Sequence, residues 1–137
     1  MVLLVVLIGV VGFGAIQLIP IQRTNPPVAS EPNWDSPATR TLAARACFDC
    51  HSNETRWPWY SYVAPVSWLI AHDVSDGRRQ LNFSDWSRAR GAEQVTRVIE
   101  SGQMPPFYYG MMHPDAVLSA QDKQNLIAGL QRTLSQS

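Results

Sequence analysis

The stretch "CFDCHSNETRWPWYSY" (residues 47–62) determines how the rest of the chain is interpreted. Its first five residues have the pattern C-x-x-C-H, and one helical turn places Cys47, Cys50 and His51 along the same edge. This pattern is typical of c-type haem attachment, in which each thiol binds a vinyl group and the adjacent imidazole binds the iron. The sequence therefore predicts one covalent haem c, held through Cys47 and Cys50.

Two other kinds of site use cysteines at this spacing. A zinc site would need Cys47 and Cys50 with two histidines from His51, His72 and His113, and it would supply four ligands of allowed type. The spacing of these histidines fits no zinc-finger pattern. A disulfide or redox dithiol is the other alternative, because an oxidising compartment permits it.

A sixth iron ligand is predicted at Met104, in the loop "SGQMPP" (residues 101–106). This methionine follows a helix-stop glycine and precedes two prolines that restrict the loop. A thioether is a soft ligand that raises the reduction potential relative to bis-histidine ligation. We therefore expect His51 and Met104 as the axial pair, with Met111, Met112 and His113 as alternates for the sixth position.

The aromatic residues that follow the C-x-x-C-H pattern are expected to contact the haem. Trp57, Trp59 and Tyr60 bring a large buried area per residue and would form a wall along one haem edge. Their N–H and O–H groups would alternatively bind the haem propionates, with Arg78 or Arg79 supplying charge. A third interpretation is an exposed rim at which a redox partner docks.

The N-terminal part of the chain predicts a membrane anchor. Residues 1–22 contain no charged side chain, and residues 2–21 as one helix would span roughly 30 Å, the thickness of a bilayer core. This apolar run exceeds that of a signal peptide, so we expect an uncleaved transmembrane helix, with a cleaved signal as the alternative. Residues 23–36 are rich in proline and predict an extended spacer.

The remaining part, residues 37–137, predicts a small all-α domain. Helices are expected from residue 36 to the cysteines, over residues 64–77 and 84–102, and from residue 119 onward. Ser84 and Ser119 are the expected N-caps, and Gly77 and Gly102 the expected stops. No useful stretch alternates with period two, so strands are not expected. The chain has 11 basic and 11 acidic residues, which gives no reason to expect a nucleic-acid partner.

The sequence resembles known families at two levels. The pattern from Cys47 to His51, followed by Gly102 and Met104-Pro105, looks like a class I cytochrome c, with His51 and Met104 at the positions of its axial ligands. This resemblance also implies a proline, Pro58 or Pro65, whose carbonyl accepts the N–H of His51. The closer resemblance is to the haem-binding domain family of small bacterial proteins, and it is carried by the Gly77-Arg78 step and by "CFDCHSNETRWPWYSYVAPVSW", "LNFSDW" and "MPPFYYGMMHPDAVLS" (residues 47–68, 81–86 and 104–119).

These inferences predict a membrane-anchored monohaem c-type cytochrome that transfers single electrons and is not an enzyme. Its expected partners are redox proteins or a respiratory or photosynthetic membrane complex. Because c-type haem is attached outside the cytoplasm, the resemblance implies a haem domain on the periplasmic side of the bacterial cytoplasmic membrane. The alternative function is a haem-based sensor or ligand-binding protein with a labile or open sixth site.

Overall fold

The computed structural model describes residues 1–89 and 94–136, and in this part of the chain the fold is all-α. An isolated bridge between Ser30 and Asp85 is the only β pairing among these residues. The α-helices are α1 (Val2–Ile16), α2 (Pro37–Ala46), α3 (Phe48–His51), α4 (Val66–Gln80), α5 (Val95–Glu100), α6 (Phe107–Met112) and α7 (Ala120–Ser135), and the 3₁₀ helices are η1 (Trp59–Tyr62), η2 (Trp86–Arg88) and η4 (Pro114–Ala116). The prediction of a small all-α domain without strands is therefore confirmed for these residues.

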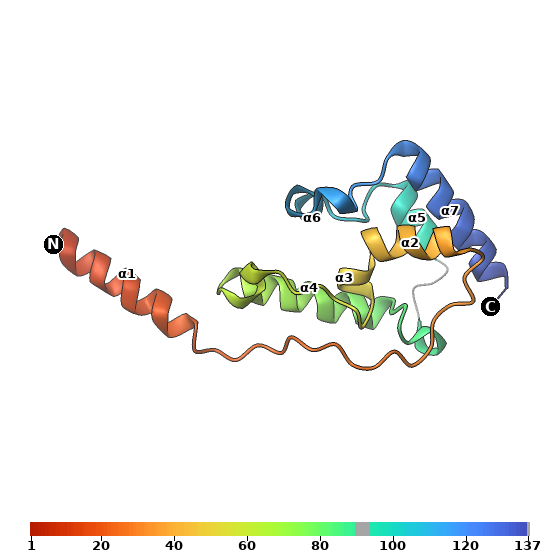
Figure 1. Cartoon of the computed structure of the whole chain (residues 1–137). Coiled ribbons are helices and arrows are strands. Elements are labelled where there is room, and N and C mark those ends of the chain that lie inside the picture. Colours follow the sequence, from red (N-terminus) through yellow and green to blue (C-terminus); the bar gives the residue numbers. More distant parts are fainter. Residues whose placement is uncertain (90–93, 137) are drawn as a thin grey trace.

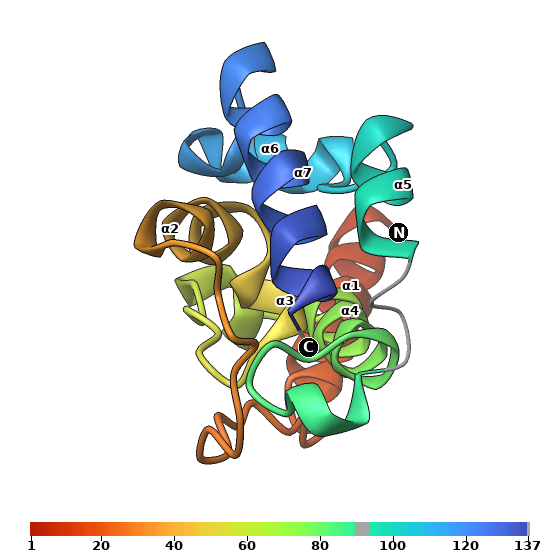
Figure 2. The same ribbon diagram turned by 90° about the vertical axis from the view of Figure 1, so that its right-hand side faces the viewer.

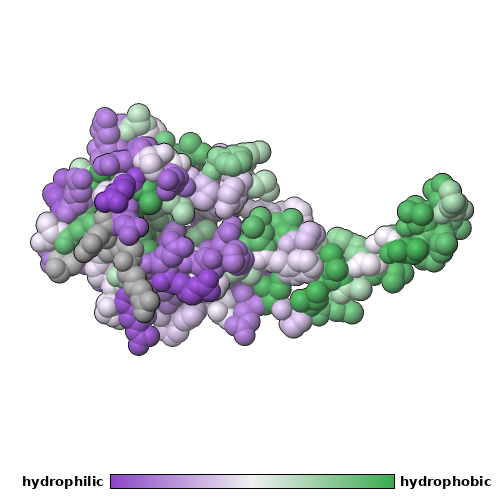
Figure 3. Space-filling view, turned by 180° about the vertical axis from the view of Figure 1, so that it is seen from behind, coloured by the Kyte–Doolittle hydropathy of each residue, from purple (hydrophilic) through white to green (hydrophobic). Residues whose placement is uncertain are grey.

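Helix α1 is shorter than the predicted membrane span. It has 15 residues, none of them buried, and it projects away from the domain (Figure 1). Its apolar surface is plain in the hydropathy view (Figure 3). Within residues 1–89 and 94–136, no helix combines the length and hydrophobicity needed to cross a membrane. The expectation of a transmembrane helix over residues 1–22 is corrected accordingly, because the helix ends at Ile16, ahead of Pro20, which has no N–H to continue it.

The segment between α1 and α2 is extended, as its prolines predict, but it lies along the domain (Figure 1). At its start, the Gln17 amide pairs with both backbone groups of Ala64, at 2.9 and 3.2 Å. Further hydrogen bonds join Asn25 to the Thr55 carbonyl, Asn53 to the Pro27 carbonyl, and Ala29 to the Ser84 carbonyl. The segment is thus fastened to the helical domain over its length.

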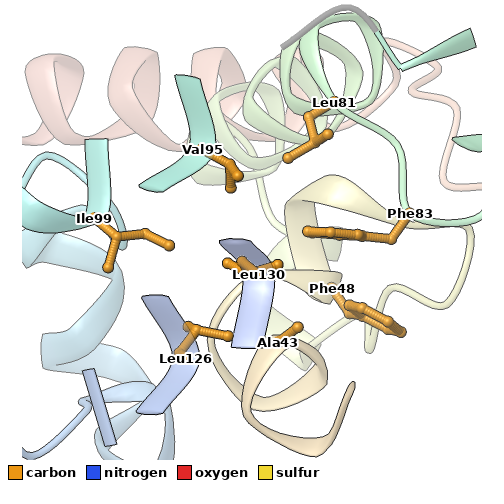
Figure 4. Packing of buried hydrophobic residues seen from close by; sticks show 8 residues of the cluster. All are labelled: Ala43, Phe48, Leu81, Phe83, Val95, Ile99, Leu126 and Leu130. Atoms are coloured by element: carbon orange, nitrogen blue, oxygen red, sulfur yellow. The ribbon is translucent and has the colours of Figure 1, made fainter. Parts of the chain in front are cut away.

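The hydrophobic core is built from helices that are distant in sequence. Figure 2 shows α7 beside α2 and α5, and Figure 4 shows the buried side chains of these elements pointing toward one another. Phe48 and Phe83 stack with ring centroids 5.5 Å apart. The cluster consists of Ala43, Phe48, Leu81, Phe83, Val95, Ile99, Leu126 and Leu130. This core fixes α3, which carries the cysteines and His51, against the C-terminal half of the chain.

Three of the expected helix boundaries are confirmed. The side chain of Ser36 accepts a hydrogen bond from the Thr39 N–H and caps α2, and Ser119 caps α7 in the same way. Gly102 has a φ of 74°, the left-handed conformation that favours glycine after a helix, and it follows the end of α5. These signals act over three or four residues, so the local sequence suffices to predict them.

Two other expected boundaries were wrong. Ser84 is buried and caps no helix, because its hydroxyl instead accepts the N–H of Asn53 at 2.9 Å. The expected helix from Ser84 to Gly102 is replaced by η2 and α5, with residues 90–93 outside the described part. Gly77 lies inside α4, which continues to Gln80.

Gly77 has a packing role instead of a capping role. A Cβ at this position would lie 2.5 Å from the Cys50 carbonyl oxygen and 3.0 Å from its carbon. Real Cβ atoms do not approach other atoms so closely, so only glycine lets α4 pack this tightly against α3. The glycine therefore sets the distance between the helix with the C-x-x-C-H pattern and its neighbour.

We predict that Gly77→Ala destabilises the protein. Overpacking costs roughly 1–3 kcal/mol, whereas alanine gains about 1 kcal/mol over glycine in a helix, so we expect a net loss of up to about 2 kcal/mol in the free energy of unfolding. Chemical denaturation followed by circular dichroism measures this loss. Gly12→Ala is the control, because a Cβ at Gly12 meets no atom within 4 Å. Equal stability of the two variants would show that α3 and α4 do not pack this closely.

Candidate functional site

The C-x-x-C-H pattern forms the helical turn that its spacing predicts. Cys47 follows α2, and its carbonyl accepts the N–H of His51 at 2.9 Å and that of Cys50 at 3.2 Å. Both cysteines are free thiols. The turn therefore brings two thiols and one imidazole together within one short helix and its N-cap.

The imidazole of His51 is fixed by two backbone carbonyls. Its Nδ1 lies 3.0 Å from the Gly77 oxygen and 3.1 Å from the Leu81 oxygen, and because carbonyls only accept, Nδ1 carries the hydrogen. Burial lowers the pKa of His51 despite these two hydrogen bonds, so the ring is neutral at pH 7. Among the described residues Nε2 has no hydrogen-bond partner, which leaves its lone pair available to a metal ion.

The expectation that Pro58 or Pro65 orients this ring was wrong. Both carbonyls that accept from His51 belong to the C-terminal end of α4 and the residue after it. The Gly77 carbonyl also accepts the backbone N–H of Leu81 at 2.9 Å, and carbonyls at the C-terminal end of a helix carry a partial negative charge that suits an N–H donor. Gly77 allows this approach because it has no side chain.

A cleft beside His51 brings together the four residues that the sequence predicts to hold the haem. Its main cavity, of about 150 Å³, is lined by Cys47, Cys50, His51 and Met104, with Gly77 and residues 105, 106, 108 and 109 among the other lining residues. A second cavity of about 90 Å³ is also lined by Cys47, His51 and Met104, and continues among Leu81, Phe83, Val95, Val98 and Ile99. We call these two cavities together the central cleft.

Met104 is held at the cleft by the end of α5. Its backbone N–H donates to the Val98 carbonyl at 3.1 Å, and the N–H of Gln103 donates to the same oxygen at 3.0 Å. The left-handed conformation of Gly102 turns the chain from α5 into this loop. The expected position of Met104, after a helix stop and before two prolines, therefore places its half-buried side chain beside the cleft.

The alternates for the sixth ligand lie elsewhere. Met111, Met112 and His113 line neither cavity of the central cleft. His113 is engaged by a 2.7 Å hydrogen bond between its Nε2 and the Tyr60 hydroxyl, and its ring stacks on Tyr109 with centroids 4.3 Å apart. Of the sulfur and imidazole candidates in residues 104–113, Met104 is the one that the described structure brings to His51.

The aromatic residues predicted to bind the haem do not line the central cleft. Trp57 donates from its indole N–H to Asn25 at 3.3 Å, and Trp59 is 77 % exposed. Tyr60 lines a separate apolar cavity, also of about 150 Å³, that adjoins the cleft at Cys50 and Tyr109. The wall of the cleft is therefore formed by residues 105, 106, 108 and 109 and by the core, and not by the tryptophan-rich run.

Arg78 also has a different environment from the one expected. Its guanidinium reaches no residue of the cleft and donates to four oxygens within 2.7–3.1 Å: the carbonyls of Ser52 and Thr24, the side-chain oxygen of Asn25, and the hydroxyl of Thr55. These acceptors belong to the N-terminal segment and to the residues after His51. Arg78 thus fastens the N-terminal segment to the site region.

No local pattern predicts the contacts of Asp49, which lies between the two cysteines. Its carboxylate is buried and accepts from the backbone N–H and guanidinium of Arg56 and from the hydroxyl of Tyr109. Burial acts to raise the pKa of Asp49, but the hydrogen bonds from Arg56 and Tyr109 outweigh it and keep the pKa below its ordinary value. The group is therefore an anion at neutral pH, in contact with α6.

The two alternative uses of the cysteines have little support in this geometry. Burial raises the pKa of the Cys47 and Cys50 thiols to about 12, whereas reactive dithiols have lowered values. Across residues 1–89 and 94–136, no three His, Cys, Asp or Glu side chains gather in an arrangement that could hold a metal ion. His72, a candidate zinc ligand, lies exposed on α4 beside Asp76.

Comparison with known families agrees with the motif. The model of the haem-binding domain family matches residues 11–132. The chain belongs to the haem-binding domain family. The match covers most of the chain, including the end of α1 and the segment fastened along the domain. No curated protein and no solved structure gives a match to it.

The central cleft has the donors that a haem-binding domain with two cysteines needs. Two free thiols, one imidazole nitrogen without a hydrogen-bond partner in the described structure, and one thioether line the same cavity system. Prolines, tyrosines and core side chains form much of the remaining wall, which suits a flat macrocycle, and Asp73, Asp76 and Gln80 also line the main cavity. Cys47 and Cys50 would hold the group covalently, and His51 and Met104 are the residues available to its iron.

We predict that Arg78→Met lowers stability. The substitution keeps the aliphatic stem but removes the donors of four hydrogen bonds, and because such bonds to a charged group contribute roughly 1.5–3 kcal/mol each when buried, we expect a loss of about 2 kcal/mol at this half-buried site. Arg79→Met is the matched control, since Arg79 is exposed and pairs only with surface groups. Urea denaturation of both variants measures the difference. Equal stability together with an altered haem spectrum in Arg78→Met would instead support the predicted haem contact.

Proposed function

We propose that this haem-binding domain protein is a monohaem c-type cytochrome that transfers single electrons and performs no chemistry on a substrate. The observation that carries the proposal is the convergence of Cys47, Cys50, His51 and Met104 on one cleft. Bound haem would supply the one-electron redox chemistry of its iron. All other tasks fall to the residues of the chain.

The residues of the cleft have separate tasks in this proposal. Cys47 and Cys50 keep the group attached, and His51 is oriented by the Gly77 and Leu81 carbonyls, which also raises the basicity of Nε2. The side chains around Met104 exclude water from the sixth position. Tyr108 lines the cleft and is 45 % exposed, so the cleft comes close to solvent there. This edge is where we expect electrons to pass to a redox protein partner.

We also propose that the protein works at the bacterial cytoplasmic membrane, with its haem domain on the extracytoplasmic side and redox proteins or a larger membrane complex as partners. The support comes from α1, whose side chains are almost all apolar and exposed, and from the absence of charge in residues 1–22. Exposed apolar surface of this extent favours a hydrophobic environment.

Replacing Met104 by alanine tests the ligation. We expect the oxidised wild-type protein to show the weak long-wavelength band of a thioether-ligated haem and the reduced protein to bind CO slowly. Met104→Ala should lose the band, bind CO rapidly and have a lower reduction potential, because the soft ligand that stabilises the reduced iron is gone. Met111→Ala is the control, because Met111 is 75 % exposed and lies outside the cleft.

Two results would contradict the electron-transfer proposal. An unchanged spectrum in Met104→Ala would exclude this residue as ligand and return attention to Met112 and His113. A five-coordinate wild-type spectrum with rapid CO binding would support the alternative, a haem-based sensor with an open sixth site.

Two aspartates in α1 test the membrane association. Val6 and Val10 are both exposed, and a charged group in an apolar environment costs roughly 2.5–3.5 kcal/mol, so the double variant Val6→Asp, Val10→Asp should leave the membrane fraction of the host cell. Val28→Asp is the control, because Val28 is also exposed but lies outside α1. Membrane retention of the double variant would overturn this part of the proposal. Immunoblots of the separated fractions give the readout.

A further inference from the structure

We propose that Tyr109 is a positioning residue for Met104, acting through its hydrogen bond to Asp49. The inference rests on the proposed ligation of iron by His51 and Met104. It adds a residue that would determine how firmly Met104 is held at the iron. The contact would hold the loop that carries Met104 against the helix that carries His51, and so keep the sixth position closed to other ligands.

The hydrogen bond joins the two segments that supply the axial ligands. Asp49 precedes His51 by two residues in α3, and Tyr109 follows Met104 by five residues in α6. The Tyr109 hydroxyl donates to the Asp49 carboxylate at 2.6 Å. In the described part of the chain it is the only hydrogen bond between α3 and residues 104–113. Any movement of α6 away from α3 must therefore break it.

The acceptor is held rigidly. The Asp49 residue is 6 % exposed, and its carboxylate accepts from the Arg56 backbone N–H at 2.9 Å, from Nε at 3.2 Å and from Nη2 at 2.9 Å. These bonds fix both oxygens in place, because rotation of the carboxylate would break them. The hydroxyl of Tyr109 thus meets a preorganised anion, which gives a stronger hydrogen bond than a neutral acceptor would.

The donor is held as firmly. The ring of Tyr109 stacks on His113 with an interplanar angle of 17°, and the Tyr60 hydroxyl fixes His113 at 2.7 Å. Pro105 and Pro106 connect Met104 to α6, and their rings restrict φ at both positions. A displacement of Tyr109 is therefore transmitted to Met104 over a short and stiff connection.

Met104 is restrained on its other side by α5, where its N–H donates to the Val98 carbonyl at 3.1 Å. The loop is thus held on α5 through Val98 and on α3 through Asp49, while α6 and the residue after it also contact Asp73 and Tyr60. Without the Tyr109 hydroxyl the hydrogen bond to the helix that carries His51 is lost, and the thioether would leave the sixth position more often. The predicted consequence is faster entry of an external ligand, with little change in the fold.

The test compares Tyr109→Phe and Tyr62→Phe in the full-length holoprotein. Tyr62→Phe is the matched control, because it makes the same chemical change at a residue that is 58 % exposed and lines neither cavity of the central cleft. A hydrogen bond to an ionised acceptor corresponds to a factor of roughly 10 to 100 in an equilibrium constant, so we expect the rate of CO binding to reduced Tyr109→Phe to rise about tenfold or more. The long-wavelength band of the oxidised variant should also vanish at a lower temperature than in Tyr62→Phe.

A second destabilised variant separates positioning from general stability. Arg78→Met weakens contacts away from Met104, so its CO-binding rate should stay at the wild-type value even if its unfolding midpoint falls as far as that of Tyr109→Phe. Asp49→Asn replaces the ionised acceptor of the Tyr109 hydroxyl by a weaker, neutral one. It should also raise the rate of CO binding, and it provides the test if Tyr109→Phe does not fold.

The outcomes for this inference and for the proposed function are distinct. A methionine-ligated wild-type spectrum with equal CO rates in Tyr109→Phe and Tyr62→Phe would overturn the positioning role and leave the ligation intact. Equal increases in Arg78→Met and Tyr109→Phe would also overturn it, since general destabilisation would then suffice. A wild-type protein without thioether ligation would overturn the proposed ligation and this inference together.

Discussion

The packing of α4 against α3 at Gly77 is the constraint on which the site depends. Only a residue without a side chain allows the two helices to come this close, since a Cβ would meet the Cys50 carbonyl at 2.5 Å. The close approach brings the Gly77 carbonyl and that of Leu81, the residue after α4, to His51, which fixes the imidazole and leaves Nε2 as its available atom. The orientation of the imidazole thus follows from one helix contact.

The central cleft also depends on the packing of α5 and α7 against α2 and α3. The apolar core joins α2 and α3 to α5 and α7, and it brings the loop after α5 beside the cysteines. On the open side, the polar contact between Asp49 and Tyr109 spans the space that the core does not fill. The cleft is thus bounded by a hydrophobic core on one side and by a charged hydrogen bond on the other.

The N-terminal segment is more closely bound to the domain than its composition indicates. Its prolines predict an extended chain, which is what the structure has, but composition says nothing about what an extended chain lies against. Gln17, Asn25 and the partners of Arg78 fasten it to the region after His51. The family match, which begins within α1, is consistent with a segment that is part of the domain.

The sequence alone determined the features that arise within a few residues. The turn of the C-x-x-C-H pattern, the Ser36 and Ser119 caps and the stop at Gly102 depend on neighbours three or four positions away, so their patterns suffice to predict them. Met104 was also found this way, because its loop is bounded by a glycine and two prolines.

Only the tertiary structure decided which distant groups meet. His51 and Gly77 are 26 positions apart, and Tyr60 and His113 are 53 apart, so no local pattern could reveal that one glycine orients the imidazole or that a tyrosine engages the alternative histidine. The same reason explains Arg78 and Ser84: each had a plausible local role, but hydrogen bonds to distant backbone groups gave it another. The residue types in the sequence indicate which side chains could bind a haem, and the packing of the helices determines which of them line the same cleft.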